Sequence, residues 1–142
     1  MTPFLSLLLL LAYIPQSTKL LTADLQITIQ KTDSDRGKIL VLVFDGEDGF
    51  PDQVEKAFKQ IVLEPKNKKA IVRLENIPVG NYAVTVLHDE DDNGKMTNNF
   101  AGLPREKYGF SNNPKIYFSP PSFEKSAIAV ASANQAIQID LR

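Results

Sequence analysis

The run Ile39-Leu40-Val41-Leu42-Val43-Phe44 decides the fold class of this chain. Its six consecutive apolar residues, half of them β-branched, are typical of a central β-strand that is buried on both faces. The polar and glycine-containing segments 33–37 and 45–49 bound the run with turns. In such a strand, Leu42→Ala is expected to cost about 2–5 kcal/mol of stability.

Strands of alternating character are predicted on both sides of this run. Leu25, Ile27 and Ile29 alternate with polar residues, which is the pattern of a half-buried strand. The same alternation recurs near the end of the chain. The other predicted strands span residues 61–63, 70–74, 81–88, 116–118 and 127–131, and the last of these is expected to form a hairpin with residues 136–141.

One short helix is predicted over residues 52–59. Asp52 could cap its free amides with Glu55 three residues later, and Val54, Ala57 and Phe58 would share one face. About seven or eight short strands with a single helix indicate an all-β protein, an antiparallel β-sandwich of the immunoglobulin-like or transthyretin-like kind.

Composition narrows the class of protein further. Apolar residues make up 43% of the chain and charged residues 23%, which is ordinary globular usage. The formal net charge is -1, so the basic excess of a nucleic-acid-binding protein is absent. The chain has no cysteine, which excludes disulfides, thiol nucleophiles and cysteine-ligated zinc.

The N-terminal segment is expected to direct export. Residues 4–14 are apolar except for Ser6, a run too short to span a bilayer but suited to a signal peptide. Cleavage is expected after Ser17 or after Ala23. Residues 1–20 are therefore assigned to the signal peptide and 21–142 to one periplasmic or extracellular domain without a transmembrane segment. The alternative is a buried N-terminal strand or helix.

The loop that begins at Asp89 carries the strongest candidate site. Asp89, Asp91 and Asn93 precede Gly94 with the spacing of calcium-loop ligands, and Lys95 could add its backbone carbonyl. The twelfth position is Phe100 instead of glutamate, so Asn98, Asn99 or Asp92 would have to complete the site. The alternative is an ordinary acidic turn without a metal.

Two other groups of residues are candidates for chemistry or binding. His88 is the only histidine, and a hydrogen bond between its strand end and the long loop is favoured over catalysis. Tyr108, Phe110, Asn112 and Asn113 combine aromatic rings with amides, which suits a ligand or partner surface. The favoured alternative is that the aromatic rings pin the long loop to the sandwich.

Four ordered motifs resemble a bacterial secreted family known as domain of unknown function 2141. They are residues 46–51 (GEDGFP), 74–84 (LENIPVGNYAV), 88–95 (HDEDDNGK) and 108–113 (YGFSNN). The Pro78-x-Gly80-x-Tyr82 pattern is also similar to transthyretin-like and carboxypeptidase-regulatory-like sandwiches. In the family an acidic residue usually follows the Asn-Gly loop, but residues 95–99 hold none. The family has no assigned activity, so the resemblance implies a fold and a location but no reaction.

A secreted or periplasmic binding or structural module is the expected function. A weak calcium site in the 89–99 loop is its one candidate cofactor. Phosphate-binding loops, serine-elbow motifs and zinc-protease motifs are absent from the sequence, so no catalytic activity is expected. An envelope protein, a peptide or a glycan is the expected partner. The alternatives are a metal-dependent hydrolase that uses His88, Asp89 and Asp91, or an accessory domain that acts beside another protein.

Overall fold

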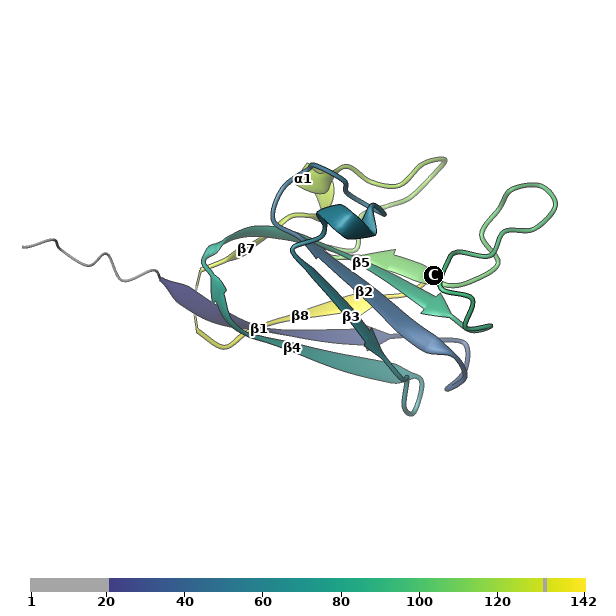
Figure 1. Cartoon of the computed structure of the whole chain (residues 1–142), viewed down its shortest axis with the longest axis horizontal. Helices are drawn as coiled ribbons and strands as arrows, with labels where there is room; N and C mark the ends of the chain where they lie inside the picture. The colour runs from purple at the N-terminus through teal and green to yellow at the C-terminus, as the bar shows by residue number, and fades with distance from the viewer. Residues whose placement is uncertain (1–20, 132) are drawn as a thin grey trace, which may run out of the picture.

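The computed structural model describes residues 21–131 and 133–142, whose strands form two facing sheets (Figure 1). The predicted signal segment, residues 1–20, lies outside this range. The strands are β1 (Thr22–Gln30), β2 (Lys38–Phe44), β3 (Lys59–Leu63), β4 (Lys69–Pro78), β5 (Gly80–Asp89), β6 (Tyr108–Phe110), β7 (Ile128–Val130) and β8 (Gln135–Asp140). A 3₁₀ turn, η1 (Val54–Lys56), and a single helical turn, α1 (Phe123–Ser126), complete the elements. The predicted all-β sandwich is confirmed.

One sheet has the strand order β4-β1-β8, and the other has the order β3-β2-β5-β6 with β7 paired to the start of β5. The sandwich is antiparallel apart from β1 and β8, which pair in parallel. The predicted hairpin between the last two strands is wrong, because β7 and β8 belong to different sheets. Pairing with β5 and β1 instead lets Val130 and Ile139 enter the common core. No helix in the described ranges is long and apolar enough to cross a membrane.

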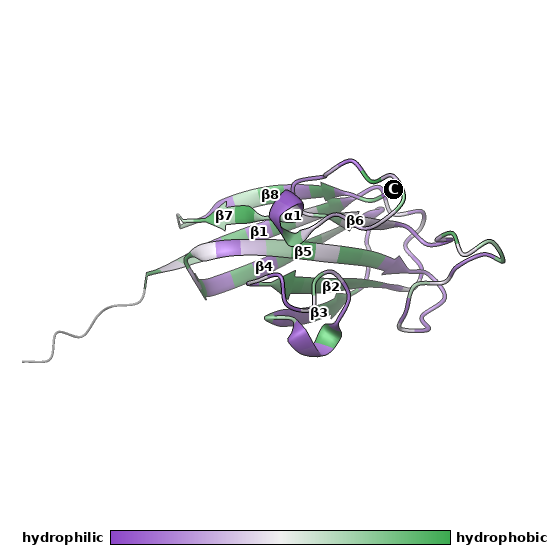
Figure 2. Cartoon of the chain, turned by 90° about the horizontal axis from the view of Figure 1, so that it is seen from above, coloured by the Kyte–Doolittle hydropathy of each residue, from purple (hydrophilic) through white to green (hydrophobic). Residues whose placement is uncertain are grey.

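The core lies between the two sheets. Ile27 and Ile29 of β1 are fully buried in it, as the alternation in that strand predicts, and Val41 of β2 is fully buried beside them. In Figure 2, hydrophobic segments, drawn in green, recur along the strands of the sandwich. Leu42 points to the outer face of its sheet and is only partly buried. The expectation that the whole of β2 is buried on both faces is therefore wrong.

A second apolar cluster covers one end of that outer face. The ring of Phe50 lies 5.4 Å from Phe44, 6.0 Å from Phe110 and 5.9 Å from Phe123, measured between ring centroids. These contacts hold the β2–β3 connection and α1 against β2 and β6. They give the molecule a small third layer over the sandwich.

The helix predicted over residues 52–59 is replaced by turns. Only the three residues of η1 are helical, Lys59 already begins β3, and Val54 is 45% exposed. A segment of two turns is too short to hold a helix by itself. Its one aromatic residue, Phe58, packs instead against the core, with its ring 5.4 Å from that of Tyr82.

The predicted strand at residues 116–118 is a loop, and a strand appears instead where a loop was expected. Residues Tyr108–Phe110 form β6, which pairs with residues 85–87 of β5. Tyr117 and Phe118 are 77% and 105% exposed. Residues 108–110 thus form a strand and residues 116–118 a loop, although both are three-residue runs that contain aromatic side chains.

Candidate metal site

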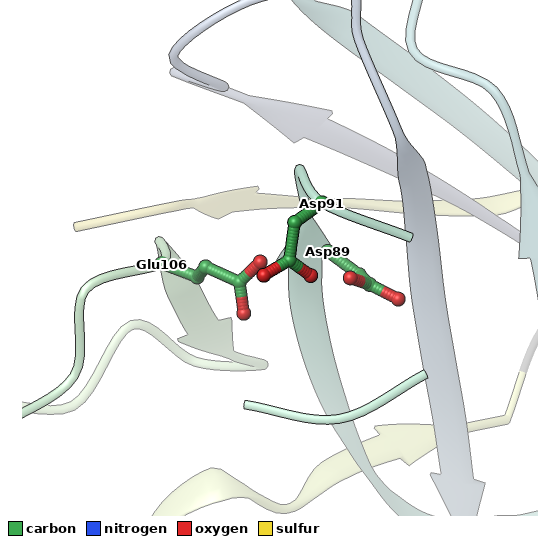
Figure 3. Close-up of side chains that lie close together, drawn as sticks. All are labelled: Asp89, Asp91 and Glu106. Carbon is green, nitrogen blue, oxygen red and sulfur yellow. The ribbon is translucent and has the colours of Figure 1, made fainter. Parts of the chain in front are cut away.

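Three carboxylates meet where β5 ends and β6 is about to begin. Asp89, Asp91 and Glu106 each offer an oxygen, and these atoms all lie within 4.8 Å of one another (Figure 3). Asp89 is fully buried, Glu106 is partly buried and Asp91 is exposed. The group therefore has one deep member and an open side that faces solvent.

The pairing of β5 with β6 brings Glu106 to this group. Leu87 is opposite Tyr108, and the His88 amide donates to the Lys107 carbonyl at 2.8 Å. One further step along this register places Glu106 beside Asp89. The sequence prediction missed Glu106 because it treated β6 as loop. The available signal was that Glu106 is the only carboxylate between residues 93 and 123.

The loop after β5 folds around the three carboxylates. Asp89 accepts hydrogen bonds from the amides of Asn93 at 3.0 Å and Gly94 at 2.7 Å. The Asp91 carboxylate accepts from the Thr97 hydroxyl at 3.1 Å. Glu106 accepts from the amides of Glu90 at 3.0 Å and Thr97 at 2.9 Å. Backbone amides and the Thr97 hydroxyl thus hold the three carboxylates in place.

The charge of the group is not balanced by ion pairs. Among the residues that the structure describes, none of the salt bridges involves Asp89, Asp91 or Glu106. A carboxylate has about four lone-pair sites, so each retains capacity beyond its present hydrogen bonds. Calcium binds oxygen at about 2.3–2.6 Å, so two ligands of one ion lie at most about 5 Å apart. The three oxygens lie within 4.8 Å of one another and therefore fall inside this limit.

The other predicted ligands have partners within the loop. The Asn93 side chain accepts from the Lys95 amide at 2.9 Å and donates to the Thr97 hydroxyl at 2.8 Å. Asn98 forms an isolated bridge with Pro104. Lys95 is exposed. The structure therefore brings two of the predicted residues, Asp89 and Asp91, together with one that was not predicted.

His88 lies apart from this group. It is fully buried on the inner face of β5, and its Nε2 atom lies 2.9 Å from the Arg36 carbonyl oxygen. The ring thus contacts the connection between β1 and β2, while the expected hydrogen bond to the long loop is made by the His88 backbone amide, which donates to Lys107. His88 and Asp89 are neighbours on a strand, so their side chains leave it on opposite faces.

The same β1–β2 connection supports the start of the loop. The Ser34 hydroxyl and the Arg36 guanidinium both donate to the Glu90 carboxylate, the latter at 2.8 Å. These two hydrogen bonds lower the pKa of the Glu90 carboxyl, and the bond from Ser34 has the larger effect. Glu90 is thus committed to a structural contact and does not join the three carboxylates.

The predicted ligand surface is occupied by contacts within the protein. Phe110 is 4% exposed and packs against Phe50, and Tyr108 contacts Phe110 at 6.0 Å. The side-chain Nδ2 of Asn112 donates to the Lys125 carbonyl at 3.0 Å, and that of Asn113 donates to the Gln138 carbonyl at 2.9 Å. These contacts anchor β6 and the residues after it to the rest of the protein.

The comparisons with known proteins give a family and no activity. No curated protein and no solved structure gives a significant match. The similarity to transthyretin-like sandwiches therefore stays a prediction. A family model, described as "Uncharacterized protein conserved in bacteria (DUF2141)", matches residues 27–138, which include the six strands β2 to β7 in full and the three clustered carboxylates. The chain belongs to this family, as its four sequence motifs predict.

Proposed function

We propose that the protein is an exported, non-catalytic binding or structural module whose β5–β6 loop is stabilised by a calcium ion. The convergence of Asp89, Asp91 and Glu106, without an ion-pair partner in the described ranges, carries this proposal. Three close carboxylates repel one another, and a divalent cation relieves that repulsion. A hydrolase would need His88 near the same carboxylates, and its burial on the inner face favours a structural role.

Calcium is expected to raise the melting temperature of the metal-stripped protein. Extracellular-type sites have dissociation constants of about 0.1–1 mM, so 1 mM free calcium adds roughly 0.4–1.4 kcal/mol. For a domain of this size the rise in melting temperature is about 2–6 °C, measurable by calorimetry. Magnesium should have a smaller effect, because it requires a tight octahedral shell and loses water reluctantly.

Glu106→Gln tests the place of the site as well as its existence. This substitution keeps the size of the side chain and removes one charge, so it should abolish most of the calcium response. Glu75→Gln is the matched control, since Glu75 is an exposed carboxylate on β4 that is not among the clustered three. Equal responses in the two variants, or no response of the unmodified protein to several millimolar calcium, would contradict the proposal.

Export is expected to leave a mature chain that starts at Thr18. Of the two cleavage points predicted from the sequence, cutting after Ala23 would remove the first two residues of β1. Thr22 and Ala23 pair with Pro78 and Ile77, and Ala23 is 3% exposed. Cutting after Ser17 preserves this pairing. Mass spectrometry of protein from the periplasm or medium of its host tests this, and an intact Met1 in cytoplasmic extract would contradict export.

A further inference from the structure

We infer that the outer edge of β4 binds an extended peptide segment of another protein, in which acidic and apolar residues alternate. This inference rests on the binding role proposed above and specifies the class of partner, but it does not require calcium. The peptide would add to the β4-β1-β8 sheet as a further strand, next to β4 at the edge of that sheet (Figure 1). Backbone hydrogen bonds supply the affinity in this mode of recognition, and alternate side chains supply the specificity.

The sandwich is closed along one side and open along the other. On the closed side, Tyr108 and Arg142 exchange backbone hydrogen bonds of 3.2 and 3.0 Å, which join β6 to the residue after β8 and Leu141. The Asn113 side chain also bonds the backbone of β8, at Gln138 and Asp140. On the open side, β4 pairs only with β1 among the strands that the structure describes. An edge of this kind can accept a strand from another chain.

The backbone groups of Ile71 and Arg73 point to the open edge. Lys69 exchanges hydrogen bonds of 2.8 and 3.1 Å with Lys66, so its amide and carbonyl point away from β1. Hydrogen-bonding direction alternates from residue to residue along an antiparallel strand. Ile71 and Arg73 therefore also direct their amides and carbonyls away from β1, where no described strand pairs with β4. The run ends before Asn76, which has a φ of +54°.

A hollow of about 540 Å³ lies beside the first half of this edge. Its apolar lining comes from Leu63 and Ala70, which belong to the rim of the core, and from Ile71, which is 53% exposed. Successive side chains of a strand point to opposite faces. An added strand would therefore direct every second side chain between the two sheets, toward this hollow, and apolar side chains suit those positions.

The charges around the hollow favour acidic side chains at the other positions of the partner. Glu64 is paired with Lys38 at 2.9 Å, and Asp35 accepts the backbone amides of Asn67 and Lys68. The cations of β4 and of the turn before it form no salt bridge within the described residues. These cations are Lys66, Lys68, Lys69 and Arg73. Five cations, with Lys38 included, thus face two anions.

Other charged residues do not reverse this excess. Asp24 and Glu75 lie toward the far end of β4, so they determine which end of the edge attracts acidic residues. In the β1–β2 connection, Lys31, Asp33 and Arg36 are each in a salt bridge. The carboxylates that follow β5 are Asp89, Asp91, Asp92 and Glu106. Because β2 separates β5 from β3, they are about 10 Å or more from the open side, beyond the Debye length of about 8 Å.

A second copy of the chain fits the edge less well than an acidic peptide. Two β4 edges would bring the same positive excess together, and juxtaposed like charges oppose association. A peptide with acidic residues at alternate positions instead places carboxylates beside Lys69 and Arg73, on the outer face of the sheet. Its apolar residues then occupy the hollow.

Fluorescence anisotropy with two labelled seven-residue peptides tests the inference. The first peptide alternates glutamate with valine, and the second has lysine in place of every glutamate. With EDTA present, the unmodified protein should bind the glutamate peptide at least about tenfold more tightly than the lysine peptide. Working without divalent cations separates this result from the calcium proposal. A calcium-induced rise in melting temperature without peptide binding would overturn this inference alone.

Two variants locate the peptide on β4. Lys66→Glu combined with Lys69→Glu should weaken binding of the glutamate peptide about tenfold or more, because attraction becomes repulsion. Lys115→Glu combined with Lys125→Glu is the matched control, since it changes the net charge equally at two exposed lysines outside the edge. Ile71→Pro removes one edge amide and should weaken binding about tenfold, while Ile71→Val keeps that amide and should bind normally.

Three results would overturn the inference: no binding of the glutamate peptide, equal binding of the two peptides, or equal losses in the two double variants. The lysines would then serve only to keep the edge unpaired. Analytical ultracentrifugation of the protein alone supplies a further test. A dimer that Ile71→Pro abolishes would assign the edge to a second copy of the chain and would also overturn the inference.

Discussion

Ile27→Ala is expected to lower the free energy of unfolding by about 2–5 kcal/mol. Ile27 lies on β1, the middle strand of its sheet, where it is opposite Val72 of β4 and Ile137 of β8. It is fully buried against the facing sheet. Alanine removes three carbon atoms from this place, and neighbours on both sides prevent the cavity from closing. The cost therefore includes both the lost burial and the cavity.

Ile71→Ala is the matched control for this substitution. Ile71 lies on the neighbouring strand opposite Thr28, and its side chain is 53% exposed, so the same chemical change there should cost less than about 1 kcal/mol. Urea unfolding of both variants measures the difference. A loss below about 1 kcal/mol at Ile27 would show that β1 does not occupy the centre of the core. Leu42→Ala should fall between the two values, because Leu42 is partly buried.

The sequence is most informative about which side chains of a strand point inward. The alternation in β1 correctly separates Ile27 and Ile29 from their polar neighbours, because the period of two is a local property of the backbone. The choice of pairing partner is not local. The residues of β7 and β8 read as a hairpin, yet the open edges of β5 and β1 bury Val130 and Ile139 more completely.

Short aromatic runs show a second limit of sequence reasoning. Residues 108–110 and 116–118 have similar composition, but only the first run can pair with β5, since Gly109 fits closely against Ile139. A Cβ atom at Gly109 would lie 2.9 Å from a methyl carbon of Ile139. This close approach joins β6 to the core, and no pattern within three residues indicates it.

The candidate metal site was predictable for its first two carboxylates and not for its third. Asp89 and Asp91 are close in sequence, so the spacing of a calcium loop identifies them. Glu106 is distant in sequence and joins them only through the β5–β6 register. Residues 95–99 hold no acidic residue, and the third carboxylate of the group comes instead from the other end of the loop.

Gly37→Ala is expected to be as costly as the core substitution and to act on the candidate site. Gly37 has a φ of +71°, and an added Cβ atom would lie 2.1 Å from the Asp89 carbonyl oxygen and 2.6 Å from the Glu90 Cα atom. Both atoms belong to the backbone, so no side-chain rotation can relieve the overlap. A left-handed alanine costs about 1–2 kcal/mol, and overpacking adds about 1–3 kcal/mol, for a total of roughly 2–5 kcal/mol.

Gly102→Ala separates these two costs. Gly102 has a φ of +78° and open space around its missing Cβ atom, so only the cost of the left-handed backbone, about 1–2 kcal/mol, applies there. The difference in unfolding free energy between the two variants therefore measures the contact of Gly37 with Asp89 and Glu90. That contact also positions the first carboxylate of the site, so Gly37→Ala should reduce the calcium-induced rise in melting temperature while Gly102→Ala retains it. Equal stability of the two variants would mean that residues 89 and 90 can move away from Gly37, and the fixed placement of Asp89 would then be wrong.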